Sequence, residues 1–280
     1  MKKGIALLLV AAMTAAMAAC GNSANETKAP AADTQAETSG VQDTEAADTA
    51  ADTQAETSGD SDKLIMVTEA GFAPYEYTED GQTVVGVDVD IANAIAEAMG
   101  KELVVQNTAF DGALLAVQQG KADFAAAGIS VTEEREKVMD FSVEYATSKQ
   151  VVVVNKEAGR VDSVDALSGD LVIGVQTGTV ADYYCQDKGW TPKAYGKFME
   201  AAMDLKNDKI DCIIMDALPA EEMVAANDDL AVLDGEVFTD RYAIAVQKGN
   251  QELLDQINAV LEQLIADGKI EEFTINHTTK

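Results

Sequence analysis

The segment from Ala125 to Arg135 carries residue types that suit the binding of a small anion. Gly128 has no Cβ, so a ligand or another stretch of backbone can come close to it. Ser130 or Thr132 can cap a following helix, and Ser130 and Glu133 have the spacing of a capping box. Because a capped helix start offers free backbone N–H groups and the positive end of a dipole, the segment suits an anion.

Arg135 falls in the first turn of this expected helix, where a guanidinium opposes the helix dipole. One reason to place an arginine there is to hold a carboxylate with two parallel hydrogen bonds. A surface arginine on an ordinary helix, beside a serine that only caps it, explains the same residues. The segment by itself leaves both interpretations open.

Two segments of the chain show the same order of features. Residues 120–128 and 208–216 each follow an expected helix, contain lysine, an apolar residue and aspartate in succession, and continue as a strand. The second strand ends in Asp216, which also stands in position to cap the helix after it. Since ligands of open α/β sheets bind at the C-terminal ends of strands, the repeat indicates two lobes of similar architecture, each with a candidate site.

Apolar runs and helical periodicity predict an α/β body that begins at Lys63. The expected strands cover residues 64–67, 103–105, 122–126, 151–154, 171–175, 208–216, 230–233 and 242–246. The expected helices include one that ends at Gly100, one that ends near Gln119, and three over residues 199–207, 251–267 and 270–276. Residues 68–77 are expected to form a loop, and the polar residues 145–150 a crossover between domains.

The bulk composition narrows the function. The 280 residues suffice for one large domain or two of ordinary size. A net charge of -29 argues against nucleic acid and anionic lipid as partners but leaves a cationic ligand open. His277 is the one histidine of the sequence, which argues against histidine-based catalysis and against a metal site built from histidines. We expect no catalytic residue, no metal and no cofactor. Cys185 and Cys212 are interpreted as small buried hydrophobic residues, with a disulfide between them left open.

The N-terminus has the features of an export signal. Lys2 and Lys3 precede an apolar run over residues 5–19, which is short for a membrane span and fits a signal peptide. The run ends in small residues before Cys20, which resembles a bacterial lipobox, although Met17 stands where leucine is usual. The prediction is a signal peptide over residues 1–20 and a lipidated Cys20 that anchors the protein without spanning the membrane. Cleavage at an Ala-x-Ala site, with Cys20 incidental, is the alternative.

Residues 21–62 are predicted to be a disordered acidic tether. The segment has ten acidic residues and one basic residue, and its largest hydrophobic side chain is Val41. The sequence AADTQAETSG occurs twice, over residues 31–40 and 50–59. We interpret this repeat as low-complexity sequence and not as a solenoid repeat. Because its charges repel each other, the tether is expected to be extended and to hold the folded body away from the membrane.

The folded body contains a further motif. The run from Gly86 to Ile91 reads Gly-x-Asp-x-Asp-apolar, with Val87 where an aromatic or larger aliphatic residue is more usual. This run, the segment that contains Arg135, and Asp216 occur in the order that resembles the family 3 solute-binding proteins, the amino-acid receptors of ABC importers. The resemblance covers residues 63 to about 277. It implies a two-lobed α/β periplasmic-binding-protein fold (type II), in which residues 63–148 and 241–280 form the first lobe, residues 149–240 form the second, and two crossovers form a hinge.

The resemblance also implies a ligand-binding site. The α-carboxylate of an amino acid would be bound by Gly128, Ser130, Arg135 and Thr179, and its ammonium by Asp216 and the Gly128 carbonyl. The positions that resemble determinants of side-chain specificity are Glu69, Phe72, Phe110, Gln176 and Met215. Glu69 favours a basic side chain, arginine or lysine, because an acidic ligand would face a like charge. Gln176 could instead serve an amide, which keeps glutamine open.

The resemblance further implies a monomer on the outer face of the cytoplasmic membrane, or in the periplasm of a Gram-negative cell. It would deliver its ligand to the transmembrane subunits of an ABC permease and would not be an enzyme. One alternative is an enzyme of the cyclohexadienyl-dehydratase type, which uses the same fold and for which Glu69 is the available acid. Another is a surface sensor or adhesin, whose partner binding would survive Arg135→Ala.

Overall fold

The structure is a computed structural model, and it describes residues 62–278 of the chain. The predicted signal peptide, the lipidation site at Cys20 and all but the last residue of the predicted tether lie outside this range and stay predictions. Within the described residues, no helix is both long enough and apolar enough to cross a membrane.

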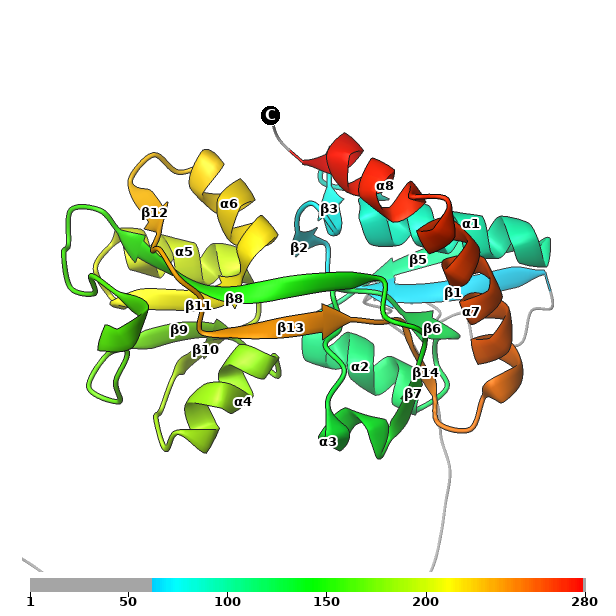
Figure 1. Cartoon of the computed structure of the whole chain (residues 1–280), viewed down its shortest axis with the longest axis horizontal. Coiled ribbons are helices and arrows are strands. Elements are labelled where there is room, and N and C mark those ends of the chain that lie inside the picture. Colours follow the sequence, from blue (N-terminus) through cyan, green and yellow to red (C-terminus); the bar gives the residue numbers. More distant parts are fainter. Residues whose placement is uncertain (1–61, 279–280) are drawn as a thin grey trace, which may run out of the picture. The chain divides into compact units, whose positions relative to one another are not determined.

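The first lobe is built on a five-stranded sheet with the order β5-β1-β6-β14-β7 (Figure 1). β1 runs parallel to β5 and β6, whereas β14 is antiparallel to β6 and β7. The strands are β1 (Lys63–Thr68), β5 (Glu102–Asn107), β6 (Phe124–Ala125), β7 (Met139–Phe141) and β14 (Ala245–Gln247). The C-terminal ends of β1 and β6 therefore lie side by side, and the segments that follow them carry most of the predicted site residues of this lobe.

Helices cover both faces of the first sheet because alternate residues of β1 point to opposite sides. Ile65 and Val67 pack in one cluster with α2, while Leu64 and Met66 pack in another with α1 and α7. The helices of this lobe are α1 (Val87–Met99), α2 (Phe110–Gln118), α3 (Glu133–Glu136), α7 (Gln251–Ala266) and α8 (Lys269–His277). The expected helices of this part of the chain are confirmed to within a few residues.

The second lobe is built on a six-stranded sheet with the order β10-β9-β11-β8-β12, to which β13 adds by pairing with β8. Its strands are β8 (Ala146–Asn155), β9 (Ile173–Gln176), β10 (Lys193–Tyr195), β11 (Cys212–Asp216), β12 (Leu230–Val232) and β13 (Phe238–Tyr242). Its helices are α4 (Val180–Asp187), α5 (Phe198–Lys206) and α6 (Ala217–Ala225), with a short 3-10 turn, η1 (Val164–Ala166).

Side-chain alternation along β11 again explains why helices pack on both faces of the second sheet. Cys212 and Ile214 pack on the face covered by α4, whereas Ile213 and Met215 pack on the face covered by α5 and α6. Cys185 of α4 lies in the same cluster as Cys212, and both thiols are buried and free. Their interpretation as small buried hydrophobic residues is confirmed.

Two antiparallel strands, β8 with ten residues and β13 with five, run between the lobes (Figure 1). Their register pairs Gln150 with Phe238 at one end and Ala146 with Tyr242 at the other. The polar residues 145–150 were predicted to be a crossover, and they form the entry to β8 and its first half. Tyr145 and Tyr242, at the first-lobe ends of these strands, are buried in one core cluster with Phe72 and Phe198, which come from different lobes.

The prediction that residues 68–77 form a loop is wrong in part. β2 (Gly71–Phe72), β3 (Glu76–Thr78) and β4 (Val84–Val85) make a small antiparallel sheet beside the first lobe. Gly86 then separates β4 from α1, because it has φ 134° and a Cβ there would lie 2.1 Å from the carbonyl oxygen of Tyr75. The local hydrogen bonds between β3 and β4 could not be recognised from a sequence with so few apolar residues.

Candidate ligand-binding site

A cleft between the two lobes brings together most of the predicted site residues. It is lined by Phe72, Glu76, Phe110, Ala127, Gly128, Ser130, Gln176, Thr179, Val180, Phe198 and Asp216. The void at its centre measures about 20 Å³. Ligand pockets usually span roughly 300 to 1,000 Å³, so the two lobes are in close contact around this point.

Gly128 has the conformation that its residue type indicated. Its φ is 53°, and a Cβ at this position would lie 2.7 Å from Cε1 of Phe72. The close approach predicted at Gly128 is therefore confirmed, and the approaching group is the ring of Phe72. The backbone N–H of Gly128 donates to the Asp88 carboxylate at 3.0 Å, which fixes the loop after β6 against the start of α1.

Arg135 is buried, with 5% of its surface exposed, so the alternative of a surface arginine is wrong. Its Nη1 donates to the carbonyl oxygen of Ser130 at 2.7 Å and its Nη2 to that of Gly178, in the other lobe, at 3.0 Å. The guanidinium lies 5.5 Å from the centre of the Phe110 ring. Its Nε is buried and makes no hydrogen bond to the described residues, so this N–H can donate to a further acceptor.

The helix that contains Arg135 begins at Thr132. The Thr132 hydroxyl accepts from the N–H of Arg135 at 3.2 Å, so the capping box expected from Ser130 and Glu133 is wrong. Ser130 instead donates through its hydroxyl to the carboxylate of Asp240 on β13. In the second lobe, Thr179 caps α4 and donates to the carbonyl oxygen of Gln176 at 2.8 Å.

Asp216 lies at the end of β11, buried at the N-cap position of α6. Its side chain makes no capping hydrogen bond and accepts from the hydroxyl of Tyr242 instead, so a side-chain capping role is wrong. Burial, with a smaller contribution from the charge of nearby Asp240, raises the pKa of Asp216 to about 6. Because a buried carboxylate has lost its hydration, the ionised form of Asp216 would be stabilised by a cationic partner.

Glu69 and Gln176 meet across the cleft. The Gln176 amide donates to Oε2 of Glu69 at 3.1 Å and to the carbonyl oxygen of Gly196 at 3.2 Å. Oε1 of Glu69 is buried and has no hydrogen-bond partner among the described residues, and Nζ of Lys197 lies 3.8 Å from it. Burial raises the pKa of Glu69, although Gln176 and Lys197 oppose this effect.

The cleft contains more acid than the sequence indicated. Glu76 lines it and is buried beside Asp88, and both this burial and the charge of Asp88 raise the pKa of Glu76 well above its usual value. Of the buried charged residues that the structure describes, Arg135 is the one cation, while Glu69, Glu76, Asp88, Asp182, Asp216 and Asp240 are acids. This balance suits a ligand that brings positive charge.

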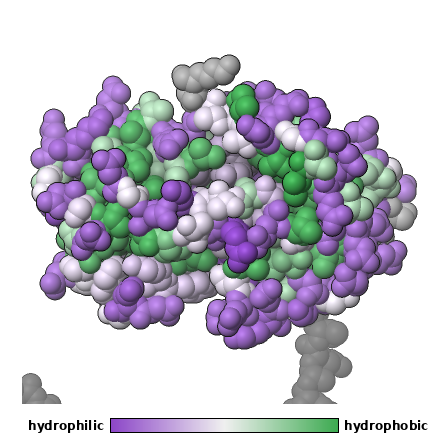
Figure 2. All heavy atoms as spheres, viewed as in Figure 1, coloured by the Kyte–Doolittle hydropathy of each residue, from purple (hydrophilic) through white to green (hydrophobic). Residues whose placement is uncertain are grey.

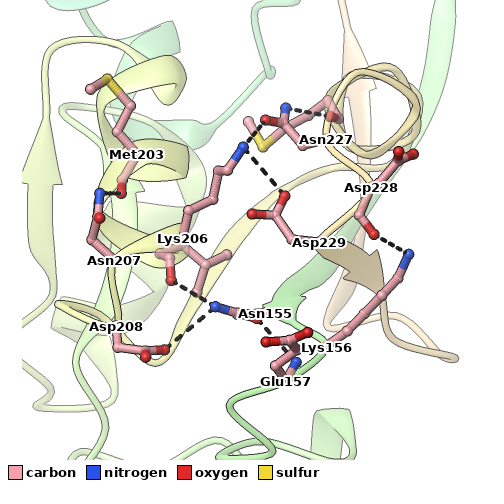
Figure 3. A network of polar contacts seen from close by, with 12 residues as sticks. Asn155, Lys156, Glu157, Met203, Lys206, Asn207, Asp208, Asn227, Asp228 and Asp229 are labelled. Carbon is pink, nitrogen blue, oxygen red and sulfur yellow. Dashed lines mark hydrogen bonds and ion pairs between the residues drawn. The ribbon is translucent and has the colours of Figure 1, made fainter.

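Met215 is not part of the central cavity. Its buried side chain lines a separate groove of about 730 Å³ between α5 and α6, together with Met199, Met203 and Met223. Glu69 and Arg135 are likewise absent from the lining of the central void. Strand alternation turns Met215 toward α5 and α6, and its contact with a ligand stays a prediction. A polar network lies beside the groove, in which Lys206 contacts Asn227 at 2.8 Å and Asp229 at 3.3 Å (Figure 3).

The comparisons with known proteins agree with this architecture. The profile of the bacterial extracellular solute-binding proteins, family 3, matches residues 64–278. The chain belongs to this family. The arginine-binding extracellular protein ArtP of Bacillus subtilis is 30% identical over 279 residues, which cover 97% of this chain and 96% of that protein.

Two solved structures are similar to this solute-binding protein. The amino acid ABC transporter substrate-binding protein AbpA of Streptococcus pneumoniae, bound to L-arginine, is 33% identical with a TM-score of 0.72, over 77% of this chain and 94% of that chain. An ancestral arginine-binding protein bound to glutamine is 35% identical with a TM-score of 0.70, over 76% and 96%. They support the type II two-lobed fold that the sequence predicted.

Several residues in or beside the cleft of this solute-binding protein escaped the sequence analysis, among them four with charged or aromatic side chains. Glu76 and Phe198 line the central cavity, while Lys197 and Asp240 contact Glu69 and Ser130. Lys197 did carry a signal, because it occupies the N-cap position of α5, where a positive charge opposes the helix dipole. No group of three or more histidine, cysteine, aspartate or glutamate side chains in the described range is arranged to hold a metal ion.

Proposed function

We propose that the protein binds an amino acid with a basic side chain, arginine above all, in the cleft and delivers it to an ABC permease. The observation that carries the proposal is the buried guanidinium of Arg135, whose Nε has no hydrogen-bond partner among the described residues. Buried donors of this kind are normally paired, so the unpaired Nε indicates an acceptor supplied from outside. The relatives named for arginine binding support the choice of ligand.

An amino acid is a zwitterion and needs opposite charges at its two ends. Arg135 and the hydroxyls of Ser130 and Thr179 would bind its α-carboxylate, whereas the Gly128 N–H already donates to Asp88. Because Ser130 now donates to Asp240, its hydroxyl would turn from one carboxylate to another. Asp216 and the Gly128 carbonyl would bind the α-ammonium, and ionisation of Asp216 would accompany binding.

The side chain of arginine would meet matching chemistry at two aromatic rings and one acid. Phe72 and Phe110 line the cavity and would contact its methylene groups. Glu69 offers Oε1, which has no hydrogen-bond partner among the described residues, to the guanidinium, and Gln176 holds the other oxygen of the same carboxylate in place. Charge-assisted bonds between arginine and carboxylate are among the stronger hydrogen bonds in proteins.

Entry of a ligand requires the lobes to separate, because the central void is about 20 Å³. β8 and β13, the two crossing strands, would be the hinge between a first lobe (63–148 and 241–280) and a second lobe (149–240). A ligand that contacts both lobes favours the closed form, which the permease would then recognise. We expect a monomer held at the membrane by the lipid on Cys20 and the tether of residues 21–62.

Isothermal titration calorimetry of the whole chain, unfolded and refolded to remove any carried ligand, tests the proposal. L-Arginine should bind, and L-glutamate should not. Arg135→Ala should weaken arginine binding by about 100-fold or more, because an ionic partner of a buried carboxylate is removed. Arg241→Ala is the matched control, since that arginine is 61% exposed, and it should change the affinity less than twofold. Unchanged binding in Arg135→Ala would reject the proposed site.

A further inference from the structure

Lys197 and Glu69 form an ion pair between the lobes that no part of the proposed function uses. Glu69 follows β1 in the first lobe, and Lys197 precedes α5 in the second. The Glu69 side chain is 2% exposed, whereas that of Lys197 is 52% exposed, so the ammonium reaches the buried acid from the solvent side. Their separation of 3.8 Å is within ion-pair range but too long for a hydrogen bond.

The pairing of Glu69 is incomplete as a result. Oε2 accepts from Gln176, but Oε1 has the distant ammonium and no hydrogen bond within the described chain. A buried carboxylate without a nearby cation is strongly destabilised, which explains why a lysine is drawn toward it. The contact stays loose, however, and a donor that reaches hydrogen-bonding distance would replace it.

We propose that Lys197 is a specificity-determining residue that acts as an internal competitor for the cation subsite at Glu69. When the ligand side chain is uncharged, the ammonium stays at Glu69 and neutralises it, and when the side chain is a guanidinium, the ammonium moves out into solvent. This inference rests on the proposed function, because it assigns Glu69 to the ligand side chain.

The chemistry of the two cations makes this exchange favourable. A guanidinium presents a planar fork that matches a carboxylate, whereas an ammonium is a strongly hydrated charge on a flexible stem of four carbons. Since half of Lys197 is already in solvent, its head regains water when it leaves. The consequence is a cleft that binds neutral polar side chains as well as basic ones, and that binds arginine less tightly than Glu69 alone would allow.

Arginine and citrulline test a charged and an uncharged ligand side chain at Glu69, because they have nearly the same shape and differ in the charge of the side chain. In Lys197→Met the competitor is gone, so arginine should bind about threefold more tightly. Citrulline should bind about tenfold more weakly, because closure on it would bury Glu69 without a cation. The preference for arginine over citrulline should therefore rise by about 30-fold. Lys197→Arg should lower the preference, since a tethered guanidinium competes better than an ammonium.

Calorimetry on the whole refolded chain measures both dissociation constants. Lys121→Met, an exposed lysine in the turn after α2, makes the same change of net charge and should leave the preference within twofold of the unaltered chain. Thermal unfolding confirms that each variant is folded. A preference unchanged in Lys197→Met, or weaker arginine binding there, overturns this inference while the proposed function stands. No binding of arginine by the unaltered chain overturns both.

Discussion

The backbone N–H of Gly128 donates to the carboxylate of Asp88 at 3.0 Å, although 40 residues separate them. Asp88 is fully buried in the first turn of α1, and its other oxygen accepts from the Tyr145 hydroxyl at 2.7 Å. One carboxylate thus joins the start of α1, the loop of the candidate carboxylate site and the segment that enters β8. Asp88, the first acid of the Gly-x-Asp-x-Asp run, therefore has a structural role in the ligand-free protein.

Asp88→Ala should lower the free energy of unfolding by about 3 kcal/mol, because two buried donors lose their acceptor. Asp90→Ala is the matched control in the same helical turn. Asp90 has a side chain 36% exposed and pairs with His277 at 3.0 Å, so its loss should cost under about 1 kcal/mol. Urea unfolding of both variants provides the comparison, and equal losses would show that the bond to Gly128 contributes little.

Gly128→Ala should destabilise the protein by about 3 kcal/mol for two reasons. An alanine at a φ of 53° is strained, and its Cβ would meet the Phe72 ring at 2.7 Å. Gly100→Ala separates these effects, because Gly100 has a φ of 66° and nothing lies within 4 Å of a Cβ there. Its cost should be about 1 kcal/mol from backbone strain. If urea unfolding gave both variants the same loss, the close packing of Phe72 on Gly128 would be refuted.

The sequence could predict those parts of the molecule that depend on local chemistry. The positions of the long strands β1, β5 and β8 and of most helices followed from apolar runs and periodicity, whereas the short strands β2, β3, β4, β7 and β10 were missed. The close approach at Gly128 followed from the missing side chain. Arg135 stood out because a cation at a helix start opposes the dipole. Figure 2 shows hydrophilic residues around much of the rim of the described body.

The remaining parts depend on contacts between distant segments, which periodicity cannot reveal. Ser130 has the right spacing for a capping box, but Asp240, 110 residues away, attracts its hydroxyl instead. Met215 is one residue from Asp216, and the alternation of β11 sends the two side chains to different cavities. Whether the ligand contacts assigned to these residues are made stays a prediction.

The stability of the ligand-free protein should depend on pH through Asp216. Its pKa is raised to about 6 in the folded protein by burial, against about 4 in an unfolded chain. The folded state therefore binds the proton more tightly, and this contribution is present below pH 4 and lost as the pH rises through 6. Relative to Asp216→Asn, the unaltered chain should lose about 2 kcal/mol of unfolding free energy between pH 4 and pH 7.

Urea unfolding of both proteins at pH 4, 5, 6 and 7 measures this difference, and the common effects of the other acids cancel in the subtraction. The difference in unfolding free energy between the two proteins could stay constant from pH 4 to pH 7, or the unaltered chain could gain stability relative to Asp216→Asn as the pH rises. Either result would mean that Asp216 is already ionised at low pH. In that case the short contact with the Tyr242 hydroxyl would outweigh the burial.

Phe198→Ala should affect both stability and ligand binding, because its ring lies between the lobes. The Phe198 ring stacks on that of Phe72 with centroids 5.9 Å apart, and Phe198 is 3% exposed and lines the central cavity. We expect a loss of about 3 kcal/mol in urea unfolding and about tenfold weaker arginine binding by calorimetry. Met199→Ala, at the neighbouring position and 73% exposed, should change stability by less than about 0.5 kcal/mol. If Phe198→Ala lost stability but kept its arginine affinity, the Phe72–Phe198 stack would stabilise the contact between the lobes only in the ligand-free protein. It would then have no part in ligand binding.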